Sequence, residues 1–138
     1  QNFYGLQIPT RTPFKNQIKI MNNNPSKLKM YICVKKSIPS HKVLGVAHGV
    51  LMAHLKFKFN PADSEYETDA NVIYGQWLEN SFRKVICEVT DEEFEILKKE
   101  SDYITVTESG LDGMEIAHIF CPRFEWPKMF KFFPLLKV

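Results

Sequence analysis

Two strand-like runs with two helix-like segments between them constrain the fold of this chain more than any other feature. The run at residues 30–34 is apolar and rich in β-forming residues, and "FRKVICEVT" at residues 82–90 has strand composition again. The segments at 41–57 and 70–80 that separate them show helical periodicity. Because a helical crossover joins parallel strands, we expect these two strands to run parallel in one sheet.

A capping box marks the next helix. Thr90 and Glu93 have the required spacing, and the acidic "DEE" that follows Thr90 suits a helix N-terminus, so we expect a helix at 91–100. Two further strands, "DYITVTESG" and "MEIAHIFCP", are joined by a short glycine-containing turn, which indicates a hairpin. The order β-α-α-β-α-β-β predicts a three-layer α/β fold, with a four-stranded mixed sheet and helices on both faces.

The segment at 41–57 is predicted to be a largely buried helix. Ser40 suits the N-cap, because its hydroxyl can accept a backbone N–H of the first turn. Apolar residues at helical spacing form the expected buried face: Leu44, Ala47, Leu51 and Leu55, widened by Val43, Val46 and Val50. Small residues recur every four positions at Gly45, Gly49 and Ala53. We expect this stripe to let the helix approach a sheet or a neighbouring helix closely.

The length of the chain sets its domain organisation. A chain of 138 residues with 44% hydrophobic content can bury one proper core. We therefore expect one α/β domain at residues 28–138, preceded by an extended N-terminal arm at 1–27. Met21 resembles a natural start, so residues 1–20 are expected to be an upstream extension. Residues 60–71 are expected to form a mobile acidic loop, and the aromatic, basic C-terminal tail is expected to pack across the domain or a partner.

Apolar runs and cysteine usage bound the cellular setting. Each apolar run is shorter than the roughly 18 residues of a membrane span, which predicts a soluble, cytoplasmic protein that binds no membrane. Cys33, Cys87 and Cys121 form no CxxC pair and lie in strand-like runs, so we expect reduced core thiols. The chain has no HExxH motif, and the spacing of His41 and His48 is not that of a recognised ligand pair. We accordingly predict neither a metal site nor a cofactor.

Charge is divided unevenly between the two halves of the chain. Residues 1–62 hold ten Lys or Arg and no Asp or Glu, whereas residues 63–138 hold eight Lys or Arg and sixteen Asp or Glu. Such a division favours binding of nucleic acid or another phosphate-bearing ligand by the basic half. The alternatives are a solvated basic face, or a basic edge that meets an acidic edge in a homodimer.

Three stretches together point to a known family. "KMYICVKKSIPSHKVLGVAHG" at residues 29–49 leads from a strand through a short turn into a helix with a basic start and an internal histidine. "TESG" places Glu108 and Gly110 at the turn before the last strand, and the chain ends in a proline-containing, basic and leucine-bearing tail. Over about residues 28–138 this pattern resembles the type-2 peptidyl-tRNA hydrolase family and its small relatives.

The resemblance implies hydrolysis of the ester that joins a peptide to the 3′ end of tRNA. Either His41 or Lys42 takes the position of the family's lysine, and His48 takes that of its internal histidine. The implied catalytic residues are His41, Lys42 and Glu108. The implied substrate-binding residues are Lys35, Lys36, His48, Gly110 and Asp112.

The chemistry makes one structural demand. His41 or Glu108 is a candidate base for the attacking water, and Lys42 is a candidate donor to the oxyanion. Lysine side chains and the N–H groups at the start of a helix are candidates to bind the phosphates of the substrate. These groups can cooperate only if the start of the first long helix meets the last turn at one sheet edge, where ligands of open α/β sheets bind. The alternatives are structural: a core histidine at His48, a surface histidine at His54 and an ordinary turn acid at Glu108. A non-catalytic RNA- or nucleotide-binding module and a homodimeric interaction protein are the alternative functions.

Overall fold

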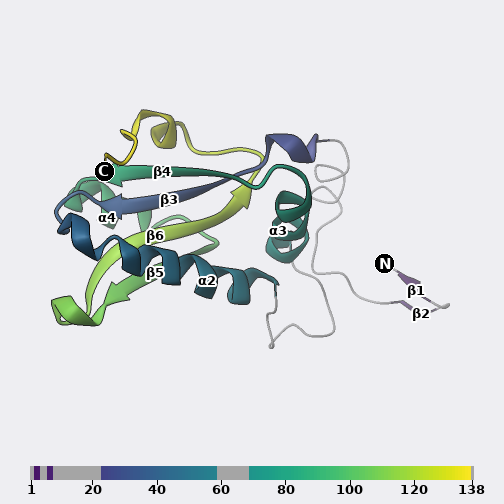
Figure 1. Cartoon of the computed structure of the whole chain (residues 1–138). Coiled ribbons are helices and arrows are strands. Elements are labelled where there is room, and N and C mark those ends of the chain that lie inside the picture. Colours follow the sequence, from purple (N-terminus) through teal and green to yellow (C-terminus); the bar gives the residue numbers. More distant parts are fainter. Residues whose placement is uncertain (1, 4–5, 8–22, 59–68, 138) are drawn as a thin grey trace.

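A four-stranded mixed sheet forms the middle layer of the molecule (Figure 1). The central strand β3 (Lys29–Lys35) runs parallel to β4 (Arg83–Val89). Its other neighbour, β6 (Met114–Arg123), is antiparallel to it and pairs in turn with the antiparallel edge strand β5 (Tyr103–Glu108). The sheet order is therefore β4-β3-β6-β5, and the predicted parallel pair and final hairpin are confirmed.

The computed structural model describes residues 2–3, 6–7, 23–58 and 69–137. Most of the predicted N-terminal arm and most of the predicted acidic loop at 60–71 lie outside this part of the chain. Near the N-terminus, β1 (Asn2–Phe3) pairs antiparallel with β2 (Leu6–Gln7). Just before β3, the 3₁₀ turn η1 (Pro25–Lys27) is capped by the side chain of Asn24, which accepts the N–H of Ser26.

Helices cover both faces of the sheet, so the three-layer prediction is confirmed (Figure 1). One face carries α2 (Leu44–Lys58) and α3 (Asp69–Asn80). The opposite face carries α4 (Asp91–Leu97) and the C-terminal tail with its 3₁₀ helix η5 (Lys128–Phe132). The capping box at the start of α4 is present: Thr90 Oγ1 accepts the Glu93 N–H, and Glu93 Oε1 accepts the Thr90 N–H.

The start of α2 differs from the prediction. A 3₁₀ turn, η2 (Ser40–Lys42), precedes the helix, and Pro39 rather than Ser40 is the N-cap residue of that turn. The Lys42 N–H donates to the Pro39 carbonyl at 2.9 Å and the Val43 N–H donates to the Ser40 carbonyl at 3.1 Å. Ser40 therefore lies inside the turn, and the turn itself satisfies backbone donors that the predicted cap would have served.

The buried face of α2 also differs from the prediction. Leu44 is 81% exposed and Leu51 is 56% exposed, and Ala47 and Leu55 are exposed as well. The small-residue stripe faces the sheet instead. A β-carbon on Gly49 would overlap the Val106 side chain and lie 3.0 Å from Ile119 Cδ1. The expected close approach is thus confirmed, whereas the expected burial of the leucines and of most of the helix is wrong.

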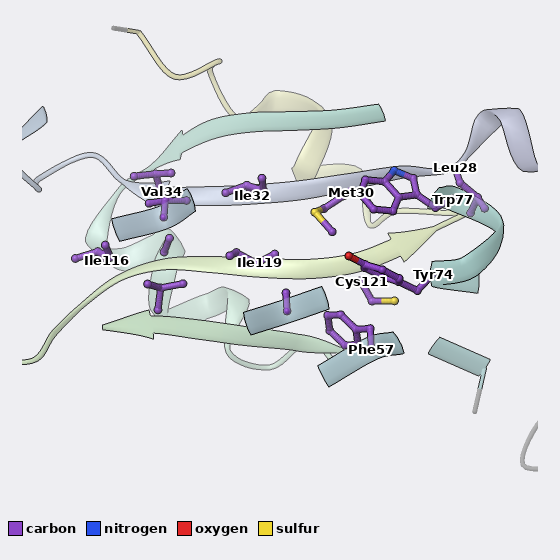
Figure 2. Packing of buried hydrophobic residues seen from close by; sticks show 14 of the residues in the cluster. Leu28, Met30, Ile32, Val34, Phe57, Tyr74, Trp77, Ile116, Ile119 and Cys121 are labelled. Carbon is purple, nitrogen blue, oxygen red and sulfur yellow. The ribbon is translucent and has the colours of Figure 1, made fainter. Parts of the chain in front are cut away.

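Two apolar cores lie on the two faces of the sheet. The first fills the space below α2 and α3, where Tyr74 and Trp77 of α3 are buried beside the inward residues of β3 and β6 (Figure 2). The second is aromatic and lies below α4 and the tail: Tyr31, Phe94, Phe120, Phe130 and Phe133 belong to it. Strand alternation explains the division, because successive side chains of one strand point to opposite faces.

The C-terminal tail completes the second core and covers one edge of the sheet. The Phe130 ring lies 5.0 Å from Tyr31 and 5.2 Å from Phe120, centre to centre. Farther along, the Glu88 N–H donates to the Pro134 carbonyl and the Leu136 N–H donates to the Ile86 carbonyl. The tail therefore packs across its own domain, which was one of the two predicted alternatives; the other was packing against a partner.

All three cysteines are buried on strands and form no disulfide, which confirms the prediction of reduced core thiols. Cys33 and Cys87 are direct neighbours on β3 and β4, with 3.5 Å between their sulfur atoms. No helix in the described part of the chain combines the length and apolar character needed to cross a membrane.

Candidate functional site

The candidate site lies at the end of the sheet that is formed by the carboxyl ends of β3, β4 and β5. These strands run in the same direction, so their carboxyl ends lie together, and η2 and the start of α2 reach the same end of the sheet (Figure 1). The turn from β5 to β6 is there too, and it contains the 3₁₀ turn η4 (Ser109–Leu111). The topology thus brings together the two segments that the predicted chemistry required to meet.

Lys42 and Glu108 both approach Gly110. Lys42 Nζ lies 2.5 Å from the position that a β-carbon on Gly110 would occupy, and Glu108 Oε1 lies 3.4 Å from the same position. Oε1 also accepts the Gly110 N–H at 3.2 Å. The absence of a side chain at Gly110 therefore leaves room for the ammonium and the carboxylate to approach one backbone position.

A second glycine admits Glu108 from the side of the helix. Glu108 Oε2 lies 2.8 Å from the position of a β-carbon on Gly45, so even an alanine there would displace the carboxylate. The turn also fixes Glu108 through its backbone, because the Glu108 carbonyl accepts the Gly113 N–H at 3.0 Å. Asp112 (φ 53°) and Gly113 (φ 75°) adopt the left-handed conformation that reverses the chain. Glu108 is consequently held between α2 and the turn.

The other predicted lysines are divided between faces of the sheet. Lys35 lies on the α4 face, with its ammonium 4.7 Å from the centre of the Phe94 ring, whereas Lys42 belongs to the α2 face. Lys36 lines a shallow depression of about 390 Å³ together with Asp91 and Glu92. Here the fold interleaves the basic and acidic halves of the chain, which weakens the positive field that the sequence predicted.

The histidines of the first helical region have different surroundings. His41 lies in η2 and is exposed, next in sequence to Lys42. His48 is exposed on α2, so the interpretation of His48 as a core histidine is wrong. His54 is partly buried, and its Nδ1 lies 3.0 Å from the Tyr74 hydroxyl. The prediction of a surface histidine at His54 is therefore also wrong, because the ring joins α2 to α3.

The start of α2 offers fewer backbone N–H donors to a phosphate than the sequence predicted. The N–H groups of Lys42, Val43 and Val46 each donate to a carbonyl three residues earlier in the chain. Backbone donors in these bonds are not available to a phosphate. Positive charge at this end of the helix comes instead from the Lys42 ammonium.

His118 is a buried polar residue that the sequence-based predictions omit. It lies on β6 with its ring stacked on Phe94, 3.6 Å between ring centres. Nε2 lies 3.0 Å from the Phe94 carbonyl, which can only accept, so Nε2 carries the hydrogen and Nδ1 accepts from the Thr105 hydroxyl at 2.9 Å. Burial lowers the pKa of His118, partly opposed by the hydrogen bond to Phe94. A histidine within an apolar strand was the signal that could have identified it.

An ion pair lies near His118 on the same face. Lys98 Nζ contacts Glu115 Oε1 at 2.6 Å and Glu95 Oε2 at 2.9 Å. The hydrogen bond from Lys98 lowers the pKa of Glu115, and the hydrogen bond from Glu115 raises the pKa of Lys98. The contact between Lys98 and Glu115 joins the end of α4 to the beginning of β6. It lies on the face of the sheet opposite Lys42.

The described residues hold no group of three His, Cys, Asp or Glu side chains placed to bind a metal ion. What the site offers is a cation and a carboxylate at an open sheet edge. No family model matches the chain, and no curated protein matches it. The resemblance to the type-2 peptidyl-tRNA hydrolases therefore depends on the residues quoted above, and the activity that it implies stays a prediction.

Proposed function

We propose that this chain hydrolyses the ester between a peptide and the 3′ end of tRNA, at the place where Lys42, Glu108 and Gly110 meet. The observation that carries the proposal is the position of Lys42 Nζ and Glu108 Oε1 against the same glycine. Ester hydrolysis needs a base for the water and a positive group for the oxygen that becomes negative. The resemblance of residues 29–49 to the first strand and helix of the family supports the same reaction.

The two side chains take complementary roles in this reaction. The Glu108 carboxylate accepts a proton from water as the water oxygen attacks the ester carbon. The Lys42 ammonium stabilises the negative oxygen of the tetrahedral intermediate. The bond between the carbon and the ribose oxygen then breaks, and that oxygen takes the proton and leaves as the 3′ hydroxyl of tRNA. The products are a free peptide carboxylate and an intact tRNA.

Binding of the tRNA backbone is assigned to the exposed basic groups around this edge. His41 is exposed and precedes Lys42 in η2. Lys36 is exposed just after β3, where Asp91 and Glu92 lie beside it. Contacts of this kind release counterions from the nucleic acid, so affinity for tRNA should fall as salt is raised. Lys35 has no assigned part, since its ammonium lies against Phe94 on the other face.

The test uses tRNA that carries an N-blocked, labelled amino acid, incubated with the wild type, His41→Ala, Lys42→Ala and Glu108→Gln. Lys99→Ala is the matched control, because Lys99 is an exposed lysine that follows α4. We expect turnover by the wild type and by the control, with losses of roughly 100-fold or more for Lys42→Ala and Glu108→Gln. Salt-dependent binding of tRNA without release of the label would contradict catalysis and indicate a binding module. Failure to bind tRNA would contradict both.

A further inference from the structure

Cys33 and Cys87 form a thiol pair that the proposed reaction does not use. They are paired in register on the parallel strands β3 and β4, and 3.5 Å separates their sulfur atoms. Neighbouring strands lie about 4.8 Å apart, within the range of Cα separations that a disulfide can bridge. Sulfur atoms in a disulfide are about 2.05 Å apart, so side-chain rotation with a small shift of the strands would form the bond.

The third cysteine lies on the other face of the sheet. Cys121 belongs to the first core, whereas Cys33 and Cys87 both belong to the second. The sheet itself therefore keeps Cys121 from reaching either member of the pair. Within one folded chain, oxidation can link Cys33 to Cys87 but cannot link either of them to Cys121.

The C-terminal tail covers this thiol pair. Phe130 and Phe133 of the tail pack in the same core as the two thiols. Leu135 forms an isolated β-bridge with Cys87, at the edge of β4 along which the tail runs (Figure 1). Both thiols are fully buried, so an oxidant dissolved in water does not reach them while the tail is in place. The hydrogen bond with Cys87 and burial raise the pKa of Cys33, which keeps this thiol protonated and unreactive.

Backbone hydrogen bonds hold the end of the tail against β4. The Glu88 N–H donates to the Pro134 carbonyl at 2.8 Å, and the Leu136 N–H donates to the Ile86 carbonyl at 2.9 Å. Between them the side chain of Leu135 is 66% exposed, so its burial contributes little. Chain ends held in this way open locally at a lower free energy than the core. Opening of the tail thus gives the thiols access to solvent without unfolding of the sheet.

We propose that Cys33 and Cys87 form a reversible disulfide when the tail opens, with a small-molecule disulfide such as oxidised glutathione as the oxidant. Cys87, on the edge strand, loses its proton and attacks one sulfur of the oxidant, and the first glutathione leaves and takes up a proton. Cys33 then loses its proton and attacks the sulfur of Cys87, and the second glutathione leaves as a thiol. Two electrons pass from the two cysteines to the oxidant. This reaction does not depend on the hydrolysis proposed above.

The test exposes the native full chain to oxidised glutathione and counts free thiols by mass spectrometry after alkylation. We expect the three free thiols of each chain to fall to one, with Cys33 linked to Cys87 in the peptide map. Dithiothreitol should restore all three. Cys121→Ser is the matched control and should form the same link, whereas Cys33→Ser should stop at a mixed disulfide between Cys87 and glutathione.

Leu136→Pro tests the part played by the tail, because proline lacks the N–H that donates to the Ile86 carbonyl. It should be oxidised at least about fivefold faster than Leu136→Ala, which keeps that N–H. Circular dichroism should show that both variants keep the fold. Gly49→Ala changes the first core on the other face of the sheet, so it should be oxidised at the wild-type rate if only the tail opens.

Four results would overturn the proposal. The first is that the wild type and Leu136→Pro both keep three free thiols under conditions in which the urea-unfolded chain is oxidised. The second is a disulfide that includes Cys121 or joins two chains. The third is equal rates of oxidation in Leu136→Pro and Leu136→Ala. The fourth is a rate in Gly49→Ala as high as in Leu136→Pro, which would mean that the whole domain must unfold first.

Discussion

Lys42 and Glu108 both approach the position that a β-carbon on Gly110 would occupy, although they lie far apart in the sequence. Lys42 Nζ and Glu108 Oε1 lie 2.5 Å and 3.4 Å from the position of a β-carbon on that glycine. The parallel and antiparallel pairings of the sheet produce this meeting, because they place the end of β5 beside the start of α2. The proposed catalytic pair is therefore a consequence of topology rather than of a local sequence motif.

Gly110→Ala should damage the site without unfolding the protein. The added methyl group would displace the Lys42 ammonium, which is the end of a flexible side chain and can move at little cost. Misplacement of this kind should lower the rate of peptidyl-tRNA hydrolysis between about tenfold and 100-fold, with an unchanged melting temperature. The rate is measured with the labelled tRNA and the melting temperature by circular dichroism.

Gly113→Ala provides the contrasting control for Gly110→Ala. Gly113 has no neighbour within 4 Å of its β-carbon position, but its φ of 75° strains an alanine. We expect a loss of about 1 kcal/mol in the free energy of unfolding, with a smaller effect on the hydrolysis rate. Equal effects of the two variants on rate would contradict the assigned role of Gly110.

Gly49→Ala should destabilise the fold although alanine favours helices. The added carbon would overlap the Val106 side chain and press on Ile119, and both belong to the first core. Overpacking costs about 1–3 kcal/mol, and the direct overlap with Val106 favours the upper part of this range, above the gain in helix propensity of about 1 kcal/mol. Urea denaturation measures the change in the free energy of unfolding.

Combining Gly49→Ala with Val106→Ala should restore part of that loss, because the smaller side chain makes room for the methyl group. The combined variant should then be more stable than the sum of the single changes predicts. Simple additivity would show that α2 does not approach β5 as closely as described.

His118 should make stability sensitive to pH below about 6.5. Its pKa is lowered in the folded state by burial, so on acidification the unfolded chain takes up the proton first. The stabilisation is complete above the ordinary histidine pKa of about 6.5 and is lost as pH falls below it, at up to about 1.4 kcal/mol per pH unit. Denaturation of wild type and His118→Gln at pH 7.5, about 6.5 and about 5.5 measures the difference.

The exposed His48 gives the control for that measurement. In His48→Gln the free energy of unfolding should depend on pH as it does in the wild type. His118→Gln should be less stable than the wild type at neutral pH, and its free energy of unfolding should change less with pH. If the free energy of unfolding changed with pH equally in the wild type and in His118→Gln, His118 would either be protonated in the folded state or contribute nothing to the pH dependence of stability.

Element types could be predicted from the sequence because local signals and tertiary packing agree there. The capping box at Thr90 and Glu93 and the apolar run of β3 each form the predicted element. Burial within α2 could not be predicted in the same way. Hydrophobicity favoured the leucines, but the fit against Val106 selects the glycine stripe, and that fit depends on a strand far away in the sequence.

The candidate site was predictable to a similar extent. The resemblance assigned Lys42, Glu108 and Gly110 to one site on the condition that the start of the first long helix meets the last turn, and the structure does bring these two segments together. Lys35 was assigned to the same site although strand alternation places its side chain with Cys33, on the face of α4. His118 was missed because its partners, Thr105 and Phe94, come from two other elements.

A double-mutant cycle on the rate of peptidyl-tRNA hydrolysis tests the central claim most directly. Lys42→Met, Glu108→Gln and the double variant are compared with the wild type at saturating substrate. If the two side chains act as a unit, the double variant should be about as slow as the slower single variant, as for other catalytic groups that act together. Independent, multiplicative effects, or a wild-type rate in either single variant, would contradict a catalytic pair formed by Lys42 and Glu108.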